Sequence, residues 1–370
     1  MIGTVKKKSK RIFYFDALRA LAIISVILFH TSLRTKGIVV GDYAQIPSFN
    51  WFMGDFLTAC MMIGVDLFLM LSGALSLGRD WEIKPFLQKR LVRICLPFLF
   101  WGFVFSIVMF CIQFFFPNVL HVVPTLNVQN AVSFIIGAYN ATSFGFGPYW
   151  FFWMILGTYL IMPIFNKWLY NADLKEAEYF LVIWLITCIF DFTLLQEFPV
   201  KISYFSGPIG MVVLGYYLRH TKRKIFNNMH IAILFIIIGV SCLMIRSYLW
   251  SSPDVMYRFS RYSIYMVINV TGIFLLFKTI DTRGIKNRFI SNPKGIFKKS
   301  VFSLAKFSYG FYLIHQPVMD ICIKLLKYFN LFHGYRVLVV GIFLSTLVIS
   351  WIIMSCLDRI PYINQLIGSK

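Results

Sequence analysis

Charged residues are scarce in this chain, and acidic residues are the scarcest. Only 14% of the 370 residues are charged, whereas about 25% is usual for soluble domains. Asp and Glu number 15 against 36 Lys and Arg, and hydrophobic residues make up 59% of the sequence. A soluble fold with so few charges could not cover its surface. The composition therefore excludes a soluble globular enzyme and a disordered chain.

Several binding motifs are also missing. No CxxC pair occurs among the seven cysteines, so they are expected to be small packing residues, and no metal site is predicted. No Walker A or GxGxxG sequence stands between a strand and a helix, which argues against ATP-driven transport and a nucleotide-cofactor domain. No zinc-finger or RNA-binding signature accompanies the net charge of +21, so nucleic acid is not an expected partner.

Long apolar runs are what the sequence has instead. Most of them reach 18 residues or more, the length that crosses a bilayer. The fold class predicted from them is all-α, a polytopic integral membrane protein with about ten transmembrane helices. The predicted spans are 13–33, 50–77, 92–116, 147–166, 178–196, 203–219, 229–249, 259–278, 302–326 and 337–357.

The basic residues predict the orientation of these spans. If the N-terminus lies in the cytoplasm, 26 of the 36 Lys and Arg residues fall on the cytoplasmic side. This bias follows the positive-inside rule and places both termini in the cytoplasm, with membrane lipid as the first partner. The prediction is a single transmembrane domain over 1–370 with cytoplasmic tails at 1–12 and 358–370 and no appended extracytoplasmic domain.

The first span carries three ionisable side chains on one stripe. Arg19 and His30 are eleven residues apart, which is close to three full turns, or about 16 Å along the helix axis. Asp16 lies one turn before Arg19, at pairing distance. Ionisable groups within a span are costly and mark functional sites. The alternatives are a structural ion pair at the headgroup edge and a histidine hydrogen-bonded within the core.

Two further spans carry polar candidates. In the second, Asp66 is expected at the depth of Arg19, as its partner or orienting group, and Ser72 precedes a glycine that would allow close helix approach. In the ninth, His315 falls near the bilayer midplane beside Pro317, which should kink the helix. Helix–helix packing is the alternative role for His315.

Four arginines and a tryptophan near the ends of the spans are further candidates. Arg90 and Arg93 end a cytoplasmic basic loop and are placed to meet phosphates. Arg258 and Arg261 lie in an outside loop, against the positive-inside trend, where an anionic acceptor would explain them. Trp150 enters the fourth span as part of an interface belt or a substrate wall.

These residues resemble the acyltransferase 3 family of membrane proteins over nearly the whole chain. The first motif is the most specific, and the others follow in the expected order. The motifs are Asp16 with Arg19-x10-His30, Gly64-Val65-Asp66-Leu67-Phe68 with Ser72-Gly73, Lys89-Arg90-Leu91-Val92-Arg93 with Pro97, Tyr149-Trp150-Phe151-Phe152 with Tyr159-Leu160 and Pro163, and Ser308-Tyr309-Gly310-Phe311-Tyr312-Leu313-Ile314-His315.

The resemblance implies an O-acyltransferase of the bacterial cytoplasmic membrane. Family members take an acyl group, commonly acetyl from cytoplasmic acetyl-CoA, and deliver it to a hydroxyl of a surface glycan or lipid-linked sugar. The family's functional arginine and histidine map to Arg19 and His30. As a form without an appended domain, this chain is expected to act alone, as a homo-oligomer, or with a separate glycan-assembly partner.

Roles for the candidate residues follow from that task. Arg19, Arg90 and Arg93 would bind the phosphates of the acyl-CoA. His30 would be the base or a transient acyl carrier, which the sequence does not separate. His315 would relay a proton or donate to the oxyanion, and Asp16 and Asp66 would hold Arg19. Ser72 and Tyr312, named in the motifs, are supporting candidates.

Two other classes of protein fit the same sequence. A secondary transporter or lipid-linked sugar translocase would also carry Asp, Arg and His within its spans, although no inverted repeat is found. A receptor or assembly subunit without chemistry is the third interpretation. The clustering of three ionisable residues on one helix stripe argues against it.

Overall fold

The computed structural model describes residues 11–36, 48–115, 128–140, 147–249, 261–282, 295–329, 331 and 334–369. Within these ranges the chain is helical, with short connections. The helices are α1 (Phe13–Thr35), α2 (Phe49–Met61), α3 (Ile63–Ser76), α4 (Ile83–Phe115), α6 (Val128–Tyr139), α7 (Trp150–Asn171), α8 (Leu174–Ile189), α9 (Pro208–His220), α10 (Met229–Leu249), α12 (Ile264–Thr282), α14 (Ile296–Tyr328), α15 (Tyr335–Leu357) and α16 (Ile363–Leu366). The predicted all-α class is confirmed.

Seven helical segments of the described residues are long and apolar enough to cross a membrane. They are Phe13–Thr35, Phe49–Ser76, Ile83–Ile112, Leu174–Leu194, Met229–Arg246, Ile264–Asp281 and Tyr335–Leu357. The protein is therefore a multi-pass membrane protein, as its hydropathy predicts.

The other three predicted spans, which form α7, α9 and α14, are helical but are not among these seven segments. Helix α9 has 13 residues and is about 20 Å long at 1.5 Å per residue, too short to cross the hydrocarbon core alone. Helices α7 and α14 have 22 and 33 residues, but both carry polar side chains on a face that the bundle buries. Polar groups at membrane depth are tolerated where protein surrounds them.

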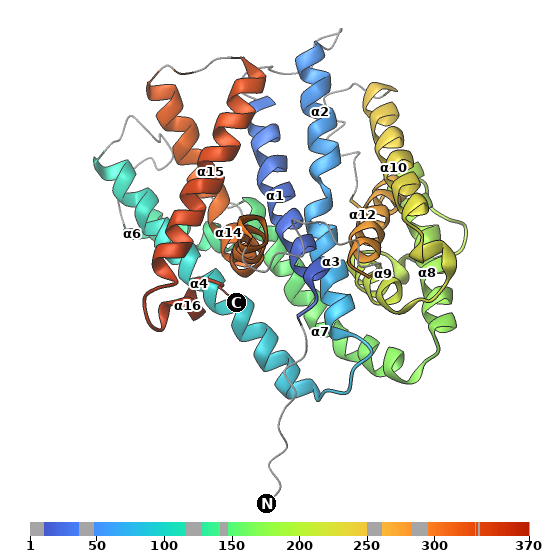
Figure 1. Ribbon diagram of the computed structural model, residues 1–370. Coiled ribbons are helices and arrows are strands. Elements are labelled where there is room, and N and C mark those ends of the chain that lie inside the picture. The colour runs from blue at the N-terminus through green and yellow to red at the C-terminus, as the bar shows by residue number, and fades with distance from the viewer. Residues whose placement is uncertain are drawn as a thin grey trace, which may run out of the picture.

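Helix α1 lies in the middle of the bundle, which explains why its polar stripe is not exposed to lipid. Figure 1 shows it beside α2 and α3, with α14 and α15 on one side and α10 and α12 on the other. It packs against α14, α3, α2, α15 and α12. Residues of α1 therefore meet side chains from both halves of the chain.

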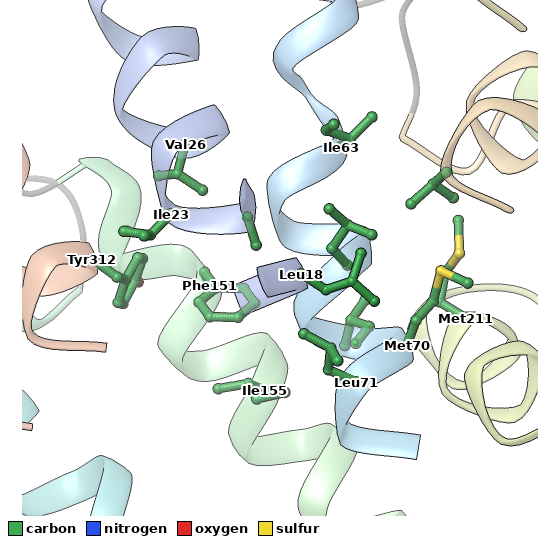
Figure 2. Close-up of a cluster of buried hydrophobic side chains, with 14 of the residues drawn as sticks. Leu18, Ile23, Val26, Ile63, Met70, Leu71, Phe151, Ile155, Met211 and Tyr312 are labelled. Carbon is green, nitrogen blue, oxygen red and sulfur yellow. The ribbon is translucent and has the colours of Figure 1, made fainter. Parts of the chain in front are cut away.

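The core around α1 is apolar and closely packed. Figure 2 shows Leu18, Ile23 and Val26 of α1 among side chains of α3, α7 and α14. Small residues bring the helices together: a Cβ at Gly73 would lie 1.7 Å from the backbone oxygen of Val212. The expected close approach beside Ser72 is thus found between α3 and the short helix α9.

The C-terminal segment returns to the bundle rather than extending from it as a free tail. Ile367 is fully buried, and its carbonyl accepts a hydrogen bond of 3.3 Å from the Trp101 indole of α4. Gly368 has a positive φ of 77°, which suits glycine at the turn against Tyr309. The segment supports α4 and α14 from the side.

Candidate functional site

His30 and His315 meet within the bundle, although 285 residues separate them in the chain. The Nε2 atom of His315 lies 3.2 Å from Nδ1 of His30, and the ring centroids are 5.0 Å apart. His315 is fully buried, whereas His30 is partly exposed. The two histidines that the sequence singled out separately therefore form one pair between α1 and α14.

The protonation of each ring nitrogen follows from its neighbours. Nδ1 of His315 lies 2.7 Å from the carbonyl oxygen of Tyr312 and 3.1 Å from that of Phe311, and a carbonyl only accepts, so Nδ1 of His315 carries the proton. Nδ1 of His30 lies 2.9 Å from the Val26 carbonyl and is a donor for the same reason. In the neutral pair, Nε2 of His315 accepts from His30. Nε2 of His30 is the remaining basic atom.

Pro317 affects the same turn of α14. Proline has no N–H, so the carbonyl of Leu313 loses its partner within the helix. The Tyr149 hydroxyl replaces that partner and donates to the Leu313 oxygen at 3.3 Å. Helix α14 continues through Pro317 to Tyr328. A residue just before α7 thus stabilises the turn that holds His315.

A narrow cavity of about 100 Å³ approaches the histidine pair from one side. Helices α1, α3, α4, α7 and α14 line it, and no acidic side chain does. The lining residues are Arg19, Phe68, Leu71, Ser72, Leu75, Arg90, Arg93, Ile94, Phe151, Ile155, Tyr159, Ser308, Tyr309 and Tyr312. The structure thus brings together three predicted arginines, Ser72 and Tyr312.

The narrow cavity has a cationic end and an aromatic end. At one end the guanidinium of Arg90 lies 5.7 Å from the centre of the Tyr159 ring and donates to Ser76 at 2.6 Å. At the other end, two turns away along α7, Phe151 meets Tyr312 with ring centroids 5.0 Å apart. Eight residues of helix separate Tyr159 from Phe151, which is about 12 Å.

A wider cavity of about 800 Å³ opens beside the cationic end. The two cavities share Arg19 and Leu75 as lining residues, so Arg19 lies at their junction. Burial lowers the pKa of Arg79 in the wider cavity, and the charges of Arg219 and Arg90 lower it further. These cations are crowded beyond what the nearby carboxylates neutralise.

Asp16 is shared between two arginines in this region. Its Oδ1 lies 3.3 Å from Nη1 of Arg19, and its Oδ2 lies 2.6 Å from Nε of Arg11. The predicted Asp16–Arg19 pair is therefore present, although Arg11 holds the carboxylate at the shorter distance. Asp16 engages only the Nη1 atom of Arg19.

Asp66 does not contact Arg19, contrary to expectation. It is fully buried, and neither carboxylate oxygen has a hydrogen-bond partner among the described residues. The guanidinium whose charge acts on it is that of Arg261. Asp66 and Ser72 are six residues apart, or 240° around the helix. When the Ser72 face lines the cavity, Asp66 must point elsewhere.

Trp150 and Arg261 contact each other on the histidine side of the bundle. The guanidinium carbon of Arg261 lies 4.1 Å from the centre of the Trp150 ring, a cation–π arrangement. Arg261 is close enough for its charge to act on His30. Arg258, the other predicted acceptor-side arginine, lies outside the described residues.

A second polar cluster beside the histidine pair was missed by the sequence interpretation. With the Gln316 amide oxygen turned toward Arg34, it accepts from Nε at 3.0 Å and Nη2 at 2.8 Å. Arg34 also lies 3.7 Å from Asp320. The signal was present in the spacing: Arg34 follows His30 by one turn, and Gln316 follows His315 directly.

Within the part of the chain that the structure describes, no three His, Cys, Asp or Glu side chains gather as metal ligands would. A family model described as an acyltransferase domain matches residues 12–355, which includes the histidine pair and every residue that lines the narrow cavity. No curated protein and no solved structure matches the chain significantly.

Proposed function

The chain belongs to the acyltransferase 3 family, and we propose that it transfers an acyl group, acetyl in the first instance, from a cytoplasmic acyl-CoA to a hydroxyl of a surface glycan or lipid-linked sugar. One observation carries the proposal. A single narrow cavity runs from three arginines to an aromatic end, and the histidine pair lies one helical turn beyond it.

The arginines match the charge of the donor. An acyl-CoA carries several phosphate charges, and guanidinium groups bind phosphates with charge-assisted hydrogen bonds. Arg90, Arg93 and Arg19 line the narrow cavity, and Arg79 and Arg219 line the wider one. The wider cavity suits the nucleotide part of the donor, and the narrower one suits its thin pantetheine arm.

We propose His30 as the reacting residue because its Nε2 atom carries no proton in the neutral pair and can therefore act as a base or a nucleophile. As a general base, Nε2 takes the proton of the acceptor hydroxyl while the hydroxyl oxygen bonds to the thioester carbon. The carbon–sulfur bond breaks, and the CoA thiolate leaves and takes up a proton. As an acyl carrier, Nε2 first bonds to the acyl carbon while the carbon–sulfur bond breaks and the CoA thiolate leaves. The acceptor oxygen then bonds to the acyl carbon, the carbon–Nε2 bond breaks, and the hydroxyl proton passes to the freed Nε2.

His315 is proposed as the partner that supports His30. Its Nε2 accepts from His30 Nδ1, which orients the ring and stabilises the positive charge that His30 gains when it takes a proton. The oxyanion role weighed for His315 is less well supported, because its N–H is already directed at backbone carbonyls.

The acceptor is proposed to reach His30 from the opposite side, near Trp150 and Arg261. The resemblance to the O-acetyltransferase of enterobacterial common antigen, a stand-alone form of the family, supports the bacterial cytoplasmic membrane as the proposed location. A homo-oligomer or a separate glycan-assembly partner is compatible with this form.

A direct assay tests the proposal. Purified protein in liposomes is incubated with radiolabelled acetyl-CoA, with and without glycan acceptors, and both released CoA and labelled glycan are measured. Labelled glycan supports the proposal. Absence of both products across acceptors and acyl chains would favour the main alternative, a transporter or lipid-linked sugar translocase. The supporting feature for it is the buried Asp66, which has no hydrogen-bond partner among the described residues.

A further inference from the structure

We propose that the aromatic end of the narrow cavity, formed by Phe68, Phe151 and Tyr312, holds the acyl group of the donor and restricts it to acetyl. The inference rests on the proposed function, because it assumes a thioester donor that enters from the arginine end. It concerns the length of the transferred chain, which family membership leaves open.

The direction of entry fixes which part of the donor lies among these rings. Arg90 lies at Tyr159, and Phe151 lies two turns deeper on the same face of α7. On α14, Tyr309 and then Tyr312 follow the same direction, and His315 comes one turn later. The reacting carbonyl must lie close to the His30–His315 pair, so the thioester end of the donor, with its short acyl group, reaches the aromatic end.

The aromatic end has little room. Phe151 stands edge-on to Tyr312, with an interplanar angle of 73°, and its centroid lies 6.3 Å from that of Phe68. Phe151 and Tyr312 are 5% and 4% exposed. Protein interiors are packed as closely as organic crystals, so these rings do not yield to an extra methylene without strain.

Phe151 and its neighbour Phe152 provide a matched pair for the test. Phe152 is buried to a similar degree, 3% exposed, but it does not line the cavity. It stacks on Phe98 instead, with centroids 3.6 Å apart. Truncation of either phenylalanine removes the same atoms from the core of α7, and only the change at Phe151 enlarges the aromatic end.

The experiment measures CoA release from acetyl-, butyryl- and hexanoyl-CoA by protein in liposomes that contain host membrane lipids and glycans. For the wild type, we expect kcat/KM for butyryl-CoA to be at least tenfold below that for acetyl-CoA, since one misplaced methylene in a fitted pocket costs about tenfold or more. Phe151→Ala should reduce this preference at least tenfold, and Phe152→Ala should leave it unchanged.

A milder variant keeps the test possible if Phe151→Ala does not fold. Phe151→Leu keeps most of the buried volume and should shift the preference in the same direction by a smaller factor. An unchanged preference in a folded Phe151 variant, or an equal shift in Phe152→Ala, would overturn the inference. So would a wild type that uses hexanoyl-CoA as well as acetyl-CoA, and that result would leave the proposed function intact. A wild type that releases CoA from none of the donors would overturn both.

Discussion

Replacement of His315 tests whether the histidine pair works as a unit. In His315→Leu, the Nδ1 proton of His30 keeps the Val26 carbonyl, 2.9 Å away, as an acceptor but loses Nε2 of His315 at 3.2 Å. The tautomer of His30 should therefore survive. What is lost is one acceptor for an imidazole that becomes positively charged in the reaction.

The size of the effect follows from that loss. A hydrogen bond to a charged group contributes about 1.5–3 kcal/mol, so kcat for acyl transfer should fall by roughly 10- to 150-fold. His315→Gln should recover most of the rate, because the Gln amide both donates and accepts. Neither variant removes a residue that lines the narrow cavity, so KM for acetyl-CoA should stay within about twofold.

The assay is steady-state transfer of labelled acetyl groups by wild type, His315→Leu and His315→Gln, with thermal unfolding in detergent as the folding control. Equal rates in all three proteins would show that His315 does not support the reaction. Equal losses in Leu and Gln, with a raised KM, would point to disturbed packing of α14 instead of a hydrogen-bond role.

Three further predictions concern other parts of the site. His30→Ala should abolish transfer and leave expression and acetyl-CoA binding largely intact; retained transfer would exclude His30 as base or carrier. Arg19→Ala, at the junction of the two cavities, should raise KM for acetyl-CoA by roughly 10- to 100-fold, the loss expected for one charge-assisted hydrogen bond, and an unchanged KM would place the phosphates elsewhere. Tyr149→Phe removes the hydroxyl that donates to Leu313 and should lower the free energy of unfolding by about 1–3 kcal/mol. That loss should shrink in a Pro317→Ala background, and an equal loss in both backgrounds would contradict the explanation.

The helix periodicity correctly predicted which side chains share one face of a single helix. The stripe of Asp16, Arg19 and His30 is present because α1 is regular from Phe13 to Thr35, and 3.6 residues per turn then fix the face. The placement of seven of the ten predicted spans succeeded for a similar reason: apolar runs of sufficient length form helices in a membrane. Each of these features depends on neighbours in the sequence alone.

Contacts between helices were harder to predict. Asp66 was expected at Arg19 because the two residues were predicted at the same depth in the membrane. Depth alone does not determine toward which neighbouring helix a side chain points. Gly64 packs so closely on Ala22 and Val26 that an added Cβ would lie 2.6 Å from both. That contact fixes the rotation of α3, and Asp66 is turned away as a consequence. No local pattern in the sequence predicts this rotation of α3.

The pairing of His30 with His315 could not be predicted from the sequence for the same reason. Each histidine was recognisable as a costly polar group in an apolar helix, and this identified the residues but not their partners. Only the packing of α1 on α14 brings them within 3.2 Å. Arg34 and Gln316, which meet beside that pair, were overlooked because Arg34 lies just past the end of the predicted first span and Gln316 carries no charge.

The separation of the arginines from His30 has a physical consequence for acyl transfer across a membrane. A charged group at the bilayer centre is expensive, so the phosphates of an acyl-CoA are best kept at the cationic end, about 12 Å from Phe151 along α7. A neutral acyl group carries no such cost. Under the proposed function, the donor stays on the arginine side and the acceptor on the other, and only the acyl group moves from one to the other at the histidine pair. Under this proposal the narrow cavity has to admit a thin uncharged arm and nothing larger.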